Sequence, residues 1–323
     1  MLSNELVDSG EVEHCWLAGP FPVLQPCCDY LFHFAYHFAS NVHAVVKSNA
    51  EQRRIKQRYP FVQTHLTKTT SSLSAVVESE VDGARASQFF VVSKDTDWVL
   101  AKELDMTPLP IEKVLVNSDQ LQTAAFHSSS KLNHLLTQEP VERRQYLHAK
   151  HNKVAIMGPE SAGKSTLALA LAQQLRFPLV NEYARLWLSY QDDVGCYEDI
   201  ALIAKVQQAI EQTVAAQAKL VLFDTGLMTT QIWSQVLFRK VPEWLEKQVQ
   251  QHHYDLVLLV APDLPWQFDP QRCQPEQEAR EHFFLQCEAL LKQLGIVYQV
   301  ISGIDRLEQA KQALVTKFSC VSC

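Results

Sequence analysis

Glycine is scarce in this chain, which has nine glycines and 14 prolines among its 323 residues. The chain also lacks any unbroken apolar stretch near the ~20 residues that a membrane-spanning helix needs, so we expect no membrane span. Its first residues, Met1 to Glu5, lack the basic start and apolar core of a signal peptide. We therefore expect a cytoplasmic protein whose cysteines are thiols, because the cytosol keeps cysteines reduced.

The chain has no excess of basic residues, since 29 Lys and Arg stand against 36 Asp and Glu and give a formal net charge of −7. Nucleic-acid-binding proteins usually carry a basic face, so this balance argues against a nucleic-acid partner. The local cluster of Arg53, Arg54, Lys56 and Arg58 is better explained as the solvated face of a helix. The C-terminal C-x-x-C has no second cysteine pair of matching spacing, so we predict no zinc site.

Two of the nine glycines belong to one motif, because residues 158–165 read Gly-Pro-Glu-Ser-Ala-Gly-Lys-Ser, a complete phosphate-binding loop. In such a loop backbone N–H groups point at phosphate oxygens, and the following helix N-terminus adds partial positive charge. Lys164 is expected to reach the β- and γ-phosphates of ATP, and the Ser165 hydroxyl to ligate Mg²⁺. The predicted nucleotide-binding residues of the loop are Gly158, Glu160, Ser161, Ala162, Gly163, Lys164, Ser165 and Thr166.

The sequence around the loop predicts an α/β domain. Residues 153–157 read as a buried strand before the loop, and leucines recur at helical spacing after it, at 167, 171 and 175. This context argues against the alternative, a surface turn that matches the motif by chance. More short, branched, apolar segments follow, separated by helical stretches, at 179–181, 220–223, 256–261 and 297–301. This pattern predicts a parallel sheet flanked by helices.

The length of the chain favours two domains. A polar stretch after Pro140 reads as a last helix and linker, so we predict a first domain at 1–148 and a second at 149–323. The first half has fewer clear signals: strands are expected at 15–19, 42–46 and 88–92, a helix at 30–38 and a loop at 67–74.

Two carboxylates stand at strand ends of the second half. Asp224 follows the strand 219–223, where it can hold Mg²⁺ beside Ser165. The alternative for Asp224 is an aspartate that only caps the next helix. Glu182 follows the second strand, at the edge where open α/β sheets bind ligands, and it can accept a proton or bind substrate hydroxyls. The alternative for Glu182 is an acid favoured by a helix N-terminus.

A proline-stiffened segment, residues 262–269, follows the fourth strand and leads to Arg272 and Arg280. Arginines on such a segment suit a lid that closes over a transferring phosphate. The alternative is that both arginines are solvated charges on a helix.

The second half, from about residue 153 to 318, resembles the kinase domain of the bifunctional NadR-type proteins, which phosphorylate nicotinamide riboside. The resemblance rests on 158–166, 182–185, 223–225 with Thr229-Thr230, and 262–269 with Arg272. It implies a kinase that moves the γ-phosphate of ATP to the ribose 5′-hydroxyl. It implies catalytic roles for Lys164, Asp224, Glu182 and Arg272, a nucleotide contact for Arg280, and substrate contacts for Glu182, Tyr183, Arg185, Trp266 and Asp269.

Trp266 is expected to stack on the cationic nicotinamide ring, because tryptophan offers the best cation–π face. The alternative is a core tryptophan held between prolines. Two residues depart from the family pattern. Gly226 stands where the family usually has aspartate, and Pro270 where it usually has glycine. The first departure is expected to cost a substrate or metal contact, and the second to stiffen the lid.

The first half resembles the adenylyltransferase domain that precedes the kinase in that family. Gly19 and Phe21 keep its phosphate motif, but Gln25 and Cys28 replace both histidines, and Cys27 replaces the second glycine. Residues 128–133 resemble the second phosphate motif, with asparagine at 133 instead of arginine. We therefore expect a degenerate nucleotidyltransferase-like α/β domain without that activity. An unrelated α/β domain is the alternative.

These observations predict an ATP- and Mg²⁺-dependent nicotinamide riboside kinase that acts in NAD salvage. One alternative is a kinase or NTPase for another small substrate. Another is a nucleotide-binding regulator whose first domain senses NAD-pathway metabolites.

Overall fold

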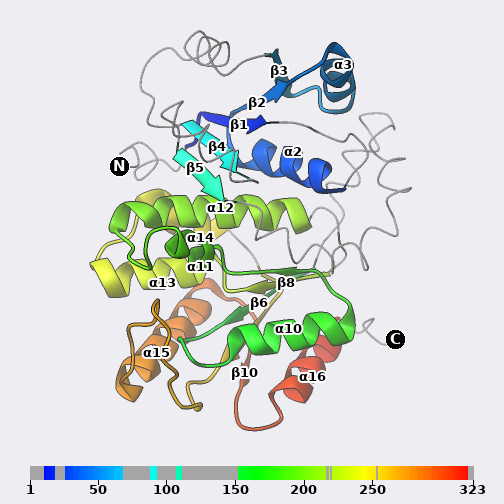
Figure 1. The fold of residues 1–323 in the computed structure, drawn as a ribbon. Coiled ribbons are helices and arrows are strands. Elements are labelled where there is room, and N and C mark those ends of the chain that lie inside the picture. The colour runs from blue at the N-terminus through cyan, green and yellow to red at the C-terminus, as the bar shows by residue number, and fades with distance from the viewer. Residues whose placement is uncertain are drawn as a thin grey trace.

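The computed structural model describes residues 11–18, 26–67, 88–92, 107–110, 152–215, 218, 220–251 and 254–318 (Figure 1). These residues form two five-stranded sheets, one in each half of the chain. Every strand pair is parallel, so the predicted α/β class is confirmed. Among the described residues no helix combines the length and the apolarity needed to cross a membrane.

The first sheet has the strand order β3-β2-β1-β4-β5, with β1 at its centre. Its elements are β1 (His14–Ala18), α2 (Pro26–Phe38), β2 (Asn41–Val46), α3 (Asn49–Arg58), β3 (Val62–Leu66), β4 (Gln88–Val92) and β5 (Thr107–Pro110). The predicted strands at 15–19, 42–46 and 88–92 and the helix at 30–38 are confirmed. The basic cluster lies on α3, where Arg53, Arg54 and Lys56 are exposed and Ile55 is buried.

Two strands of this sheet were not predicted. β3 reads Val-Gln-Thr-His-Leu and is only partly buried, so its polar residues hide the strand pattern. β5 contains Pro108 and Pro110. Proline argues against a central strand but is tolerated at a sheet edge, where β5 lies.

Most of the phosphate-motif positions predicted for the first half lie outside the described residues. This holds for Gly19, Phe21, Gln25 and 128–133, and the side chains of Cys27 and Cys28 are not described either. The boundary at residue 148 and most of the predicted loop at 67–74 also fall outside. The absence of adenylyltransferase activity and the two-domain division therefore stay predictions.

The second sheet has the order β10-β9-β6-β8-β7, with β6 between β8 and β9. Its strands are β6 (Asn152–Met157), β7 (Leu179–Val180), β8 (Leu220–Asp224), β9 (Leu256–Val260) and β10 (Tyr298–Ile301). All five were predicted within two residues at either end. Its helices are α10 (Lys164–Leu175), α11 (Tyr183–Ser189), α12 (Tyr197–Ala215), α13 (Leu227–Phe238), α14 (Glu243–Gln251), α15 (Gln277–Leu294) and α16 (Arg306–Phe318).

Alternate residues of the central strand face two separate apolar layers. Val154 and Ile156 pack with α10 and α16 on one face. Ala155 and Met157 belong to the larger core on the other face, which contains α12 (Figure 1). Strands covered on both faces become continuous apolar runs, which is why they were readable in the sequence.

Helix α12 is buried over most of its length. It contacts α11, α13 and β8 of the second half and also packs against α2 of the first half. One apolar core runs through these contacts into both halves. Elements of both halves therefore pack against α12 and support it.

Candidate active site

The phosphate loop connects the carboxyl end of β6 to the first turn of α10, as predicted. Gly158 has φ 144°, and the carbonyl oxygen of Val260 on β9 lies where a Cβ would stand. Gly163 has φ 82° in the left-handed region at the start of α10. Both positions therefore need glycine, the first for close approach of the next strand and the second for its backbone conformation.

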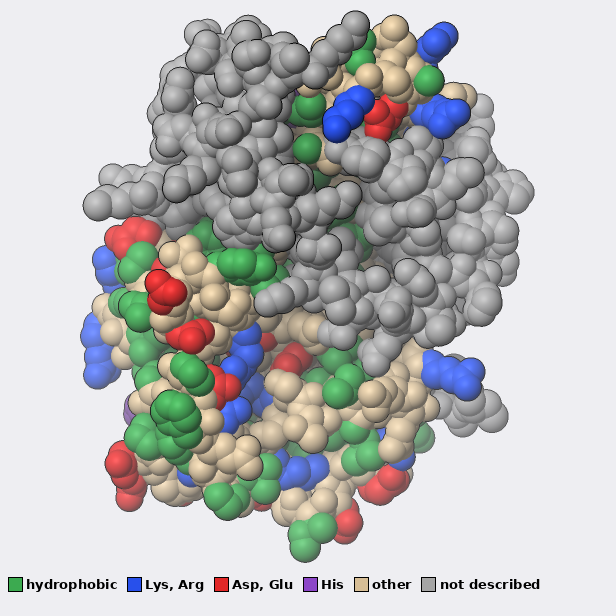
Figure 2. All heavy atoms as spheres, in the orientation of Figure 1, with side chains coloured by type: hydrophobic (Ala, Val, Ile, Leu, Met, Phe, Trp, Pro, Cys, Tyr) green, Lys and Arg blue, Asp and Glu red, His purple; other side chains and the backbone are tan. Residues whose placement is uncertain are grey.

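A cavity of about 430 Å³ opens beside this loop. Its size suits a small ligand. Acidic and basic side chains lie side by side in a hollow on this face of the second half (Figure 2). The charged side chains that line the cavity are Glu160, Lys164, Glu182, Arg185, Asp193, Asp199 and Arg272. An apolar group from α12 and α13 lines it as well, formed by Ile200, Ile203, Trp233, Leu237 and Phe238.

Asp224 ends β8 behind the loop and is almost fully buried. Burial raises the pKa of its carboxyl group, although a hydrogen bond with Ser165 and the nearby charges of Lys164 and Arg185 act in the opposite direction. One carboxylate oxygen, Oδ1, has no hydrogen-bond partner among the described residues. A buried carboxylate oxygen next to a serine hydroxyl is a donor set that suits Mg²⁺.

No group of three potential metal-ligating side chains occurs in the described part of the chain. Proteins usually hold Mg²⁺ through one or two side chains together with substrate phosphates and water. Ser165 and Asp224 are therefore the residues that would hold it.

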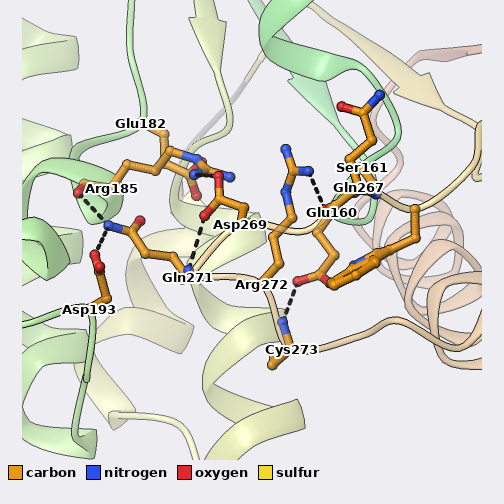
Figure 3. Close-up of polar contacts among 11 residues, drawn as sticks. Glu160, Ser161, Glu182, Arg185, Asp193, Gln267, Asp269, Gln271, Arg272 and Cys273 are labelled. Atoms are coloured by element: carbon orange, nitrogen blue, oxygen red, sulfur yellow. Dashed lines mark hydrogen bonds and ion pairs between the residues drawn. The ribbon is translucent and has the colours of Figure 1, made fainter.

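Glu182 and Arg185 stand at the start of α11, where the strand β7 leads into the site. Arg185 pairs with Asp269 at 2.8 Å, and its Nε lies 3.7 Å from Glu182 (Figure 3). Burial raises the pKa of Glu182; Lys164 and Arg185 lower it, while Asp224 and Asp269 raise it further. A carboxyl group with a raised pKa is a stronger proton acceptor than an ordinary one.

Segment 262–276 runs from β9 to α15 and covers the loop. Arg272 from this segment lines the cavity. Arg280 does not, because it is buried on α15, where it donates to the carbonyl oxygen of Leu264 at 2.9 Å and also bonds Gln277. The structure therefore places Arg280 where α15 meets segment 262–276, bonded to the segment's backbone, and its nucleotide contact stays a prediction.

Three predicted substrate residues also lie away from the cavity lining. Tyr183 is fully buried in the core. Asp269 is engaged by Arg185 and by the backbone N–H of Gln271 at 3.0 Å. Trp266 donates its indole N–H to Glu160 at 2.8 Å. Among the described residues, the tryptophan that lines the cavity is Trp233, whose ring centroid lies 4.5 Å from that of Phe283.

The two departures from the expected pattern have different surroundings. At Gly226 an added Cβ would overlap the hydroxyl of Tyr254, which donates to Glu211 at 2.9 Å. The space of a side chain at 226 is thus occupied by a buried Tyr254–Glu211 pair. Pro270, by contrast, lines the cavity within segment 262–276.

Sequence reasoning missed the wall of the cavity that α12 and α13 provide. Asp199 and Gln207 stand on α12 among other polar residues, such as Glu198, Lys205 and Glu211, so no sequence signal singled them out. Asp199 accepts from the Trp187 indole at 2.9 Å and from the backbone N–H of Cys196 at 2.7 Å. Gln207 accepts from the backbone N–H of Tyr183 at 3.0 Å and so fixes the start of α11.

Comparison with known proteins gives a family match within the second half and two curated relatives. Residues 153–308 match the AAA domain family. The trifunctional NAD biosynthesis/regulator protein NadR of Salmonella typhimurium (strain LT2) is 28% identical over 163 residues, which are 47% of this chain and 38% of that protein. NadR of Escherichia coli (strain K12) is 30% identical over 135 residues, 40% of this chain and 33% of that protein. The alignments thus span less than half the length of these curated relatives.

Two solved structures are also similar over most of the chain. The crystal structure of NadR protein in complex with NAD and AMP-PNP has 16% sequence identity and a TM-score of 0.46, over 95% of this chain and 96% of that one. The crystal structure of NadR protein in complex with NR has 17% identity and a TM-score of 0.46, over 97% and 98%.

Proposed function

We propose that this chain is a member of the NadR-type family through its phosphate-loop domain, and that it phosphorylates nicotinamide riboside with ATP. The observation that carries the proposal is the composition of one cavity. It is lined by the phosphate loop, by Glu182 and Arg185 at a strand end, and by an arginine of the covering segment. A site for a nucleotide alone would not need the second group of charged residues or the apolar wall.

The phosphate loop and Lys164 would bind the β- and γ-phosphates of ATP. Lys164 Nζ donates to the carbonyl oxygen of Pro159 at 2.7 Å, so its ammonium group already lies within the curve of the loop. Mg²⁺, when held by Ser165 and Asp224, would neutralise charge on the phosphates. Arg272 would meet the charge of the transferring group from the opposite side.

Glu182 would hydrogen-bond the acceptor hydroxyl. It would take the proton of this hydroxyl while the hydroxyl oxygen attacks the γ-phosphorus. The bond between the γ-phosphorus and the bridging oxygen then breaks, so that ADP leaves and the proton remains on Glu182. Arg185 lies beside Glu182 and would hold it toward the cavity. The raised pKa of Glu182 suits this role, because the carboxylate is a better base than an exposed one.

The acceptor is proposed to be a riboside with a flat, cationic ring. The NAD biosynthesis role in the names of the curated relatives supports nicotinamide riboside. Trp233 supplies an aromatic face in the cavity, and Phe283 holds its ring. A tryptophan face attracts a cation such as the nicotinamide ring by about 0.5–2 kcal/mol.

A panel of nucleosides tests this proposal. Nicotinamide riboside, nicotinic acid riboside, adenosine, uridine and thymidine are each incubated with ATP and Mg²⁺, and mass spectrometry records the gain of one phosphate. We expect turnover with nicotinamide riboside and none with Lys164→Ala. Turnover with another nucleoside alone would identify a different kinase, and ATP binding without any phosphotransfer would identify a nucleotide-binding regulator.

A further inference from the structure

Glu160 lies inside the phosphate loop, yet its carboxylate is turned toward segment 262–276. Its side chain is almost fully buried. Oε1 accepts the indole N–H of Trp266 at 2.8 Å and the backbone N–H of Gln274 at 2.7 Å. Oε2 accepts the backbone N–H of Cys273 at 3.0 Å (Figure 3). We call these three bonds the Glu160 clasp.

A further bond joins the same two segments on the other side of Arg272. The backbone N–H of Gln267 donates to Ser161 Oγ at 3.1 Å. Arg272 itself donates to the carbonyl oxygen of Gln267 at 2.7 Å. Arg272 is thus bracketed by residue 267, held by Ser161, and by residues 273 and 274, held by Glu160.

The far side of the segment is fastened to α11 and the turn after it. Gln271 donates to the carbonyl oxygen of Arg185 at 3.2 Å and to Asp193 at 2.6 Å. Residues 265–269 and 272–275 form neither helix nor strand. Side-chain bonds to the loop and to α11 therefore supply partners that regular secondary structure would otherwise provide.

A carboxylate is an unfavourable choice in a loop that binds triphosphate, because like charges repel. Nucleotide affinity therefore does not explain why a glutamate stands at position 160. The three donors of the clasp supply one, since only a carboxylate offers two acceptor oxygens that can accept all three bonds. Arg272 Nε is buried without a hydrogen-bond partner among the described residues.

We propose that Glu160 is a positioning residue that fixes Arg272 in the cavity wall beside the phosphate loop. Through the clasp, Glu160 sets where the guanidinium meets the transferring phosphate. The catalytic part of this inference rests on the proposed kinase function; the clasp itself does not.

Glu160→Gln is the variant that tests the clasp, because it keeps the size of the side chain but offers one acceptor oxygen in place of two. We expect hydrogen exchange at the amides of residues 273 and 274 to become at least tenfold faster, with and without ATP and Mg²⁺. Glu243→Gln is the matched control, since Glu243 is an exposed residue of α14 that pairs with Lys247. Exchange as slow in Glu160→Gln as in the control would overturn the clasp.

Kinetics test the positioning role. Glu160→Gln should lower kcat at least tenfold and leave the KM for ATP unchanged or lower, because it removes a negative charge from the phosphate loop. Trp266→Phe, which removes one of the three donors, should give a smaller loss of kcat. In a double-mutant cycle, Glu160→Gln should cost little more once Arg272→Ala is present.

Additive losses in this cycle, or a raised KM with unchanged kcat, would overturn the positioning role. Melting temperatures within about 3 °C of each other ensure that the variants are compared as folded proteins. If the wild type phosphorylates no riboside, the proposed function fails. The exchange measurement still decides whether Glu160 holds the segment.

Discussion

Replacing Gly226 by alanine tests how tightly the end of β8 is packed in front of the cavity. The φ of Gly226 is 169°, an extended conformation that alanine adopts without strain, so the cost is steric. The new Cβ would overlap the hydroxyl of Tyr254 and stand 3.2 Å from Glu211 Oε1. That hydroxyl donates to Glu211 in the core, with both side chains buried.

The magnitude follows from two contributions. Overpacking a well-packed core costs about 1–3 kcal/mol. Leaving a buried polar group without its hydrogen bond costs about 1–3 kcal/mol more. A loss of about 4 kcal/mol corresponds to a fall in Tm of roughly 8–16 °C for a domain of this size. Because Gly226 follows Asp224-Thr225, we also expect weaker Mg²⁺-dependent nucleotide binding.

Thermal unfolding followed by circular dichroism measures this loss, and Gly303→Ala is the control. Gly303, unlike Gly226, has open surroundings but a left-handed φ of 74°, so its replacement costs only the backbone strain of about 1–2 kcal/mol. Tyr254→Phe removes the hydroxyl that the new Cβ meets, so the double variant should be more stable than the sum of single losses predicts. A Gly226→Ala protein no less stable than Gly303→Ala would refute the packing argument.

Three other predictions concern the site. Lys164→Ala should abolish phosphotransfer and leave the melting temperature close to that of the wild type, because the proposed role of Lys164 is to bind the phosphates of ATP. A variant that keeps most of its turnover would contradict this role of Lys164. Burial raises the pKa of Asp224 above 3.8, so the folded state loses stability as pH rises from 3.8 through the raised pKa. Without Mg²⁺, the Asp224→Asn variant should therefore have a higher melting temperature than the wild type at pH 7. This difference in melting temperature should shrink toward pH 3.8. A difference that stays constant across a pH series of thermal melts would argue against a raised pKa of Asp224. Trp233→Leu should raise the KM for the riboside about tenfold, whereas Trp266→Leu should lower kcat and leave that KM within threefold; the reverse pattern in steady-state kinetics would restore the stacking role to Trp266.

The second sheet could be predicted from the sequence because its strands are covered on both faces. The resulting apolar runs, such as Leu256 to Val260, stand out against the helices between them. The phosphate loop was equally readable, since two glycines, a lysine and a serine at fixed spacing have one structural explanation. The first sheet was harder, because β3 is half-exposed and β5 carries two prolines.

The walls of the site depend on tertiary packing and were less readable. Trp233 on α13 and Gln207 on α12 reach the same cavity as the phosphate loop, from helices far along the chain. No local sequence pattern indicates that residues so far apart in the chain line the same cavity. Trp266 and Arg280 carry the residue types expected of ligand contacts, but one is bound by Glu160 and the other by the carbonyl of Leu264. The types of these residues thus indicated that they lie near the site, but not which groups they contact.

Transfer of an isotope label from ATP to the riboside is the sharpest test of the proposed kinase activity. The full-length protein is incubated with Mg²⁺, nicotinamide riboside and ATP labelled with ¹⁸O in the non-bridging oxygens of its γ-phosphate, and mass spectrometry follows the label. We expect labelled nicotinamide mononucleotide that is absent with Lys164→Ala and strongly reduced with Glu182→Gln. Label found only in inorganic phosphate, or in a product that Lys164→Ala still makes, would contradict it.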